Sequence, residues 1–305
     1  MATVGTWFDT STNKDIFKKV VRKWWDTTDR EPHEEWRKLC RDERTSDEYE
    51  RFGRFAGLPY GGKVEEGEEI PIYSPKFGSV KDYEQEMYAM GFRITHKMKK
   101  FNKVGLMEKL TKSMKRAMVE LKDVEIFKMW NNPTSTTYAA GFDGLSIANN
   151  SHTCLDDAGT TYDNYLGSSL SYSALDSAKN YFAYMYDDQA NVFSTKPDLL
   201  VVNYQLERTA LEIVKSDRVP QEISNTYNYY KGWIDVFSSI RLTSSTAWIV
   251  LAKNHPDYGY FVLTSMDPEV VVKDAPDTTL DTIVLSLQYF KYGVTDPRHA
   301  YFGNT

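Results

Sequence analysis

The longest regular pattern of apolar and polar positions runs from residue 95 to residue 131. Its apolar residues recur at alternating spacings of three and four, which place them on one stripe of an α-helix. They are Met107, Leu110, Met114, Ala117, Leu121 and Val124. We therefore predict a single helix that, at 1.5 Å per residue, is about 50 Å long. A compact core cannot cover such a rod, so one face should pack on a sheet while the other faces stay open.

The pattern before this helix has two parts. A helix is predicted from about Asn13, which would cap it, with apolar residues on one side up to Trp25. The mixed-charge segment 26–54 follows, and it has too few apolar residues to build a core alone. We expect it to lie along another surface.

Residues 50–96 contain glycine and proline too often for a helix and predict a long two-stranded excursion. Alternating residues from Tyr83 to Ile94 predict the strand that leads back to the long helix. A long hairpin without a core is unstable in isolation. It therefore needs a surface to lie on, and no obvious partner for it is left within this chain.

The second half alternates shorter elements and gives the class α+β. A helix is predicted over 171–187 with Ser171 or Ser173 as its cap, then a buried strand over 196–202 and a helix from Asn203. Further strands are predicted over 138–147, 233–242, 247–252, 258–264 and 280–294. The turn residues at 253–257 predict that the strands 247–252 and 258–264 form a hairpin.

Charge is distributed unevenly along the chain. The formal net charge is −6, yet residues 97–130 hold ten Lys or Arg against four Asp or Glu. Four basic residues, Lys109, Lys112, Lys115 and Arg116, fall within two turns of the predicted helix. This face is either an ordinary solvated surface or one that meets nucleic acid or an acidic partner.

A search for catalytic and ligand-binding motifs finds little. Residues 57–64 match the first seven positions of a phosphate-binding loop, but Val64 stands where Ser or Thr must hold magnesium, and four glutamates follow. His152 and Cys154 could be two metal ligands, but no second pair accompanies them. The aspartate pairs at 156–157 and 187–188 could supply catalytic carboxylates, but they are interpreted as parts of solvated turns. We predict no enzymatic activity and no cofactor.

Cellular location is indicated only weakly. Cys40 and Cys154 are the only cysteines, so no disulfide framework is expected and a reducing cytoplasm is indicated. Residues 1–10 lack the pattern of a signal peptide, and no apolar run approaches the roughly 20 residues that span a bilayer. No membrane association is predicted.

Several segments resemble the major capsid proteins of tailed bacteriophages, which have the Hong Kong 97 fold. The resemblance rests on five segments: FDGLSIANNSHT from Phe142, KPDLLVVNYQLERTALEIVKS from Lys196, the segment 225–242, AWIVLA from Ala247 and FKYGVTDPR from Phe290. The likeness extends over nearly the whole chain and is greatest to the variant with a Mu-like head subunit.

The resemblance implies a domain organisation and a set of partners. It implies an N-terminal arm (1–49), an extended loop (50–96), a peripheral domain with a spine helix (97–164), an axial domain (165–268) and a return strand of the peripheral domain (269–305). Copies would form hexamers and pentamers of an icosahedral shell around double-stranded DNA, which the spine helix would meet through sequence-blind phosphate contacts. Because the arm begins near Met1, a separate scaffold or its prior removal is implied, together with portal and decoration proteins. The alternatives are a nanocompartment of the same fold that encloses a protein cargo, and a soluble hydrolase or nucleotide-binding enzyme around residues 57–63.

Overall fold

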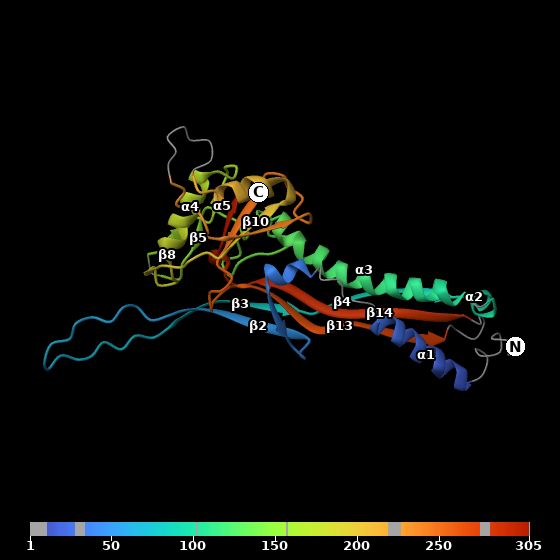
Figure 1. Cartoon of the computed structure of the whole chain (residues 1–305). Helices are drawn as coiled ribbons and strands as arrows, with labels where there is room; N and C mark the ends of the chain where they lie inside the picture. Colours follow the sequence, from blue (N-terminus) through green and yellow to red (C-terminus); the bar gives the residue numbers. More distant parts are fainter. Residues whose placement is uncertain are drawn as a thin grey trace.

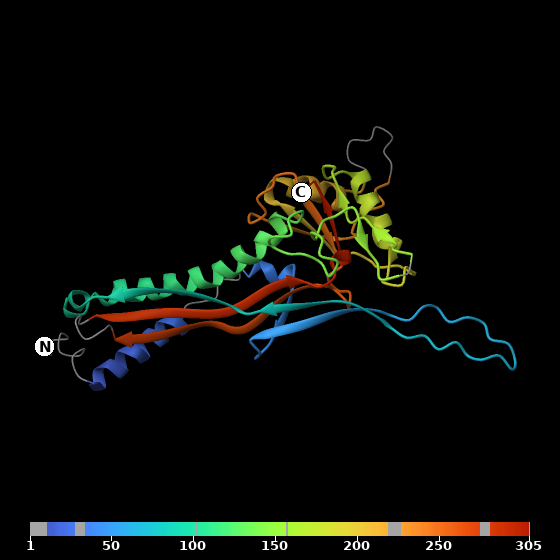
Figure 2. The same ribbon diagram turned by 180° about the vertical axis from the view of Figure 1, so that it is seen from behind.

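The computed structural model describes residues 11–27, 34–101, 103–156, 158–218, 227–274 and 281–304. A compact region carries the C-terminal end, a long sheet with helices on it extends to one side, and a hairpin projects to the other (Figures 1 and 2). The helices are α1 (Ser11–Asp26), η2 (Glu35–Lys38), α2 (His96–Lys100), α3 (Val104–Asn131), α4 (Tyr172–Ala183), η3 (Tyr204–Leu206), α5 (Glu207–Lys215) and η4 (Pro297–His299). The strands are β1 (Arg41–Arg44), β2 (Tyr49–Ala56), β3 (Lys76–Glu84), β4 (Glu86–Ile94), β5 (His152–Thr153), β6 (Thr161–Tyr162), β7 (Tyr165–Leu166), β8 (Met185–Tyr186), β9 (Val192–Phe193), β10 (Leu199–Asn203), β11 (Asp235–Ser239), β12 (Trp248–Leu251), β13 (Tyr260–Asp274), β14 (Thr282–Val294) and β15 (Ala300–Gly303).

The long sheet has the strand order β1-β13-β14-β4. The pairs β13–β14 and β14–β4 are antiparallel, whereas β1 runs parallel to β13. Along β14 buried and half-buried residues alternate, and the buried set faces the helices. The long strand predicted over 280–294 is confirmed in its described part.

The prediction of one helix over 95–131 is wrong in its extent. Two helices, α2 and α3, occupy this segment, and Phe101 caps the end of α2 while Lys103 precedes α3. The side chain of Thr95 accepts a hydrogen bond from the Met98 backbone N–H and caps the start of α2. With 28 residues, α3 is about 42 Å long. It still lies along most of the long sheet (Figure 1).

The apolar stripe of α3 is also rotated from the prediction. Met107 and Met114 are buried as expected, but Ala117 and Val124 are exposed, while Leu110 and Leu121 are half-buried. The buried residues of α3 instead include the polar residues Thr111, Lys122 and Asp123. Each has a specific partner, such as the Met107 carbonyl, which accepts from Thr111 Oγ1 at 3.0 Å. Apolar periodicity cannot detect buried positions of this kind.

The N-terminal segment packs onto its own chain. α1 begins at Ser11, so Asn13 lies inside the helix, and its Phe17, Val21 and Trp25 pack with Met107 of α3. Further along, η2 and the residues after it place buried Trp36, Leu39 and Cys40 in the main core. Residues 16–27 and 34–44 of the predicted arm therefore contribute to the cores of their own chain.

The second sheet has the order β11-β10-β12-β15-β7. One face packs on α4 and α5, where Leu200 and Val250 meet Phe182 and Ile213. The other face joins the main core around Trp130. The cap at Ser171 is confirmed, because its side chain accepts from the Ala174 N–H at 3.2 Å.

Two local predictions for this half are corrected. β12 and β13 do not form a hairpin: β12 pairs with β10 and β15, and β13 lies in the long sheet. The segment 138–147 contains one isolated bridge between Ala140 and Ser146 in place of a strand. Within the segment 269–305, β14 belongs to the long sheet while β15 belongs to the second.

Candidate assembly and nucleic-acid surfaces

The hairpin projects a row of apolar side chains away from the body. β2 and β3 pair antiparallel from Tyr49 opposite Glu84 to Ala56 opposite Lys76. Beyond them, residues 57–75 form no helix or strand and end in a turn at Glu65 and Glu68. The most exposed apolar side chains here are Ile72 (94%), Phe77 (81%), Ile70 (77%), Tyr60 (71%), Phe55 (65%) and Leu58 (58%). Large apolar side chains exposed together on one projecting segment indicate an interaction surface.

The long sheet has a second apolar surface on the face opposite α3. The half-buried set of β14 lies there, namely Ile283, Leu285, Leu287 and Tyr289. Beside it lie Val271 of β13 and Met87 of β4, which is 57% exposed. The register also places the charged residues Glu269, Lys273 and Arg93 on this face. Leu285 lies over Gly91, since a Cβ on that glycine would come within 2.5 Å of Leu285 Cδ2. A sheet with helices on one face usually presents polar residues on the other, so this apolar face also suits a contact.

The four predicted DNA-facing residues differ in their surroundings. Lys109 and Arg116 are exposed. Lys112 Nζ lies 2.7 Å from Glu108 Oε1, and Lys115 Nζ donates to the Trp25 carbonyl of α1 at 2.6 Å. Lys115 therefore helps to fix α1 on α3.

α1 contributes basic residues that the sequence interpretation had left out. It packs against α3 and carries exposed Lys19, Arg22 and Lys23. The run KKVVRK was visible in the sequence, but only the contact between the helices places it beside α3. The basic surface thus spans two helices on one side of the long sheet.

Lys122 does not belong to this surface, although it contributes to the basic count. It is 5% exposed, and its Nζ donates to Thr264 Oγ1 at 2.7 Å. The same ammonium lies 4.5 Å from the centroid of the Trp36 ring and 5.4 Å from that of Phe290. Burial lowers the pKa of Lys122 to about 8, against the opposing effect of Asp42 and Asp267.

A Lys122→Met variant is expected to change how stability depends on pH. Between pH 8 and pH 10.5 the unfolded chain holds the proton that folded Lys122 has released, so the parent gains stability as pH rises. Below pH 8 both states hold it, and the buried charge lowers the stability by about 3 kcal/mol relative to the neutral amine. In urea titrations, the unfolding free energy of the parent should therefore rise relative to that of the variant as the pH increases from 8 to 10.5. Lys109→Met, at an exposed lysine, is the control, and an equal pH profile in both variants would contradict the assignment.

The segment 57–64, similar to a phosphate-binding loop, lies in the exposed distal part of the hairpin. It follows β2, a strand of the projecting hairpin, and no helix begins between residues 57 and 75. A phosphate site of that type needs a helix N-terminus directly after the loop. The structure therefore gives nucleotide binding at Lys63 no support.

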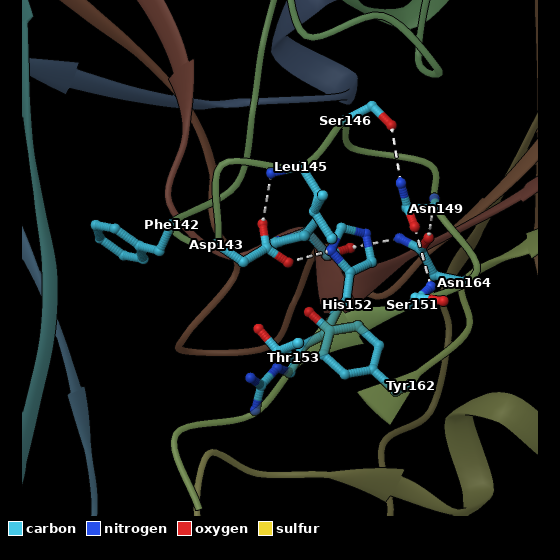
Figure 3. A network of polar contacts seen from close by, with 12 residues as sticks. Phe142, Asp143, Leu145, Ser146, Asn149, Ser151, His152, Thr153, Tyr162 and Asn164 are labelled. Carbon is cyan, nitrogen blue, oxygen red and sulfur yellow. Dashed lines mark hydrogen bonds and ion pairs between the residues drawn. The ribbon is translucent and has the colours of Figure 1, made fainter. Parts of the chain in front are cut away.

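His152 lies in a buried polar network beneath the hairpin, shown in Figure 3. Its Nδ1 is 2.6 Å from Asp143 Oδ2, and its ring stacks on Tyr162. Burial alone would raise the pKa of the Asp143 carboxyl, but the hydrogen bond and charge of His152 hold that pKa below its ordinary value. In the described part of the chain no group of three or more His, Cys, Asp or Glu could hold a metal ion. The network instead holds the turn on which the hairpin rests.

The interpretation of residues 187–188 as a solvated turn is wrong for Asp188. Its carboxylate is 12% exposed and accepts from Arg54 at 2.5 Å and from Arg298 at 2.6 Å. Asp187 keeps a turn role, since its Oδ1 accepts from the backbone N–H of Gln189 and of Asn191. Ion pairs between residues more than 100 positions apart leave no local pattern in a sequence.

Comparison with known proteins identifies the class as a capsid protein. The sequence matches the family model described as phage capsid protein over residues 79–302. The chain belongs to this phage capsid protein family. No curated protein matches it in sequence.

The fold is the Hong Kong 97-like fold of phage major capsid proteins. The chain is 10% identical to that in the procapsid of bacteriophage JBD30, with a TM-score of 0.56 over 96% of this chain and 75% of that one. With the mature capsid of bacteriophage PhiM1 it shares 11% identity and a TM-score of 0.53, over 86% and 84% of the two chains. With the capsid of a native GTA particle it shares 10% identity and a TM-score of 0.53, over 88% of both. These likenesses confirm the predicted fold.

Proposed function

We propose that this protein is the major head subunit of a tailed bacteriophage and that its copies assemble into hexamers and pentamers of an icosahedral shell. The observation that carries the proposal is a pair of apolar surfaces, namely the exposed side chains of the hairpin and the half-buried side chains on the open face of the long sheet. A single copy cannot bring them together, because the hairpin projects away from the long sheet (Figure 1). Contact between copies would remove both surfaces from water, at roughly 25 cal/mol per Å² of apolar area.

We further propose that the shell encloses double-stranded DNA and that the basic surface of α1 and α3 contacts its phosphates. Lys109, Lys112 and Arg116, with Lys19 and Lys23, supply the charge. Lysine and arginine side chains on helices bind phosphate without reading the sequence. In a protein with a formal net charge of −6, this local surplus favours a polyanion over a protein cargo.

The remaining assignments follow the family resemblance. We propose that the arm, extended loop, peripheral domain and axial domain have the bounds predicted above, and that the Mu-like variant is the most similar one. Separate scaffold, portal and decoration proteins would complete the particle in the host cytoplasm, and the protein would reside in the virion. In the described chain, no helix combines the length and the apolar character needed to cross a bilayer.

Electron microscopy of the expressed protein, with a scaffold if needed, tests the proposal. Shells, capsomers or tubes are expected, and a monodisperse monomer under all conditions would contradict it. Nucleic-acid extraction from purified particles then separates the two shell functions. DNA supports a phage head, whereas a single protein cargo supports a nanocompartment.

Neutralising the basic surface should weaken DNA retention without preventing assembly. Replacing Lys109, Lys112 and Arg116 with Gln preserves helix propensity, so the helix should lose well under 1 kcal/mol. Each lost phosphate contact should reduce the salt dependence of DNA binding by nearly one unit of slope. Particles of normal size that release DNA at lower salt than the parent are expected.

Lys115→Gln is tested separately in this series, because it removes the hydrogen bond to the Trp25 carbonyl. It should lower stability more than DNA retention. If the triple variant retains DNA as the parent does at every salt concentration, the basic face is an ordinary solvated surface.

A further inference from the structure

The hairpin changes geometry where it leaves the body. The pairing of β2 with β3 shifts register between Gly53 and Phe55, so that Gly78 and Ser79 of β3 stand opposite the single residue Arg54. A bulge of this kind bends the strand pair and redirects side chains. Gly78 fits because a Cβ there would lie 3.0 Å from the Leu155 side chain. The bulge thus brings β3 close to the body at the level of Arg54.

Arg54 points from this bulge into a buried ion cluster. Its guanidinium donates to Asp188 Oδ1 at 2.5 Å and to the Thr153 carbonyl at 2.6 Å. Arg298 donates to the same Asp188 oxygen at 2.6 Å and to Asp296. The side chains of Arg54, Asp188 and Arg298 are only 10%, 12% and 5% exposed. Removing one partner from such a cluster leaves an uncompensated buried charge, so the cluster holds its geometry tightly.

Further contacts join the hairpin root to the body, among them the packing of Phe52 and Tyr83 on Phe261. Lys81 Nζ donates to the Ala140 carbonyl at 2.6 Å, and Ser79 donates to the Phe142 carbonyl in the turn shown in Figure 3. An open cavity of about 500 Å³ lies between hairpin residues, such as Phe55, and the body residues Phe193 and Asp187. Beside it the hairpin is held by exposed hydrogen bonds, in which Gln189 Nε2 donates to the Gly57 carbonyl at 2.8 Å and Tyr60 donates to the Val192 carbonyl at 3.4 Å. The hairpin is therefore not close-packed at the cavity and has room to move.

We infer that Arg54, Asp188 and Arg298 form a latch that fixes the angle at which the hairpin leaves the body, and that opening the latch lets the hairpin swing about the bulge into the cavity. These three are positioning residues, since the apolar residues that would meet another copy lie further out on the hairpin. The consequence for shells rests on the proposed function: subunits with a free hairpin angle should assemble into particles of mixed diameter. The latch itself is a property of the single subunit.

Distance measurements on the unassembled full-length subunit test the latch independently of shell formation. Spin labels are placed at Ile72→Cys on the hairpin and Tyr184→Cys on the body, both exposed positions, while Cys40 and Cys154 are buried. Arg54→Met should broaden or shift the pulsed-EPR distance distribution. Asp188→Asn, which preserves shape, should do the same and provides a second variant if Arg54→Met folds poorly.

Arg51→Met is the matched control. The Arg51–Asp82 pair, at 2.7 Å, lies on the same two strands but is exposed and joins the hairpin only to itself. The Arg51→Met variant tests whether loss of an ion pair within the hairpin is enough to change its flexibility, and it should leave the distance distribution unchanged. Distributions for Arg54→Met and Asp188→Asn that match the control would overturn the latch. A changed distance in latch variants of a protein that never forms shells would support the latch and contradict only the proposed function.

Discussion

Replacing residues 58–75 with Asn-Gly is expected to abolish shell formation and to leave the subunit folded. The flanking residues Ala56 and Lys76 already pair across β2 and β3, so a three-residue turn including Gly57 can close the shortened hairpin. Between residues 60 and 75 every side chain is exposed. Their loss should change the unfolding free energy by about 0.5 kcal/mol or less, as for ordinary surface changes.

The effect on assembly should be far larger, because the deleted segment carries Ile70, Ile72 and Tyr60. If two of these side chains become buried between copies, the contact loses roughly 3–6 kcal/mol. That is on the order of 10² to 10⁴ in an association constant. Light scattering and negative-stain images at matched concentration should show subunits or capsomers in place of shells.

Lys63→Ala is the control for the shortened hairpin. It preserves the length and the apolar residues and should assemble as the parent does. Two results would contradict the prediction. A shortened variant that unfolds would place the hairpin in an intramolecular core, and one that forms normal shells would remove the hairpin from the contacts between copies.

The local sequence pattern was sufficient to predict helices and strands that can be recognised without knowing which other elements they pack against. The long apolar and aromatic run over 280–294 predicted β14, and a cap at Ser171 or Ser173 predicted the start of α4. The excess of Gly and Pro predicted the hairpin, whose distal part has no regular structure. The order of these elements also carried the family resemblance, since that order is a property of the whole chain.

Most of the wrong predictions concern strands and polar side chains whose partners are distant in the sequence. The turn residues at 253–257 correctly indicate a change of direction, but they do not specify that β12 and β13 enter different sheets. Lys122 donates to Thr264 and Asp123 Oδ1 accepts from the Trp36 backbone N–H, and these buried residues lie 142 and 87 positions from their partners. Asp188 is similar, as its two arginines come from β2 and η4. Burial of a polar residue is set by tertiary contacts, which apolar periodicity does not contain.

Truncating Trp36 to Ala is expected to lower the free energy of unfolding by about 3–5 kcal/mol, the usual cost for a buried tryptophan. The side chain is fully buried in the main core, next to Leu39 and Trp130. If the arm served only to contact other copies, the substitution would leave the unfolding free energy of the isolated subunit unchanged. Urea denaturation followed by circular dichroism should show a clear loss, whereas Phe101→Ala, at a 63% exposed position, should stay within about 0.5 kcal/mol of the parent.

A double-mutant cycle then shows how much of this loss comes from Lys122. Trp36→Ala removes the ring that lies 4.5 Å from the buried Lys122 ammonium, which keeps its contacts with Thr264 and Phe290 and the charges of Asp42 and Asp267. In the Trp36→Ala/Lys122→Met variant the ammonium is absent, so the double variant should be less destabilised than the sum of the two single changes. A buried cation–π contact contributes roughly 1–2 kcal/mol, which sets the size of the expected coupling. Free energies that add within about 0.5 kcal/mol would mean that Trp36 stabilises the arm by packing alone.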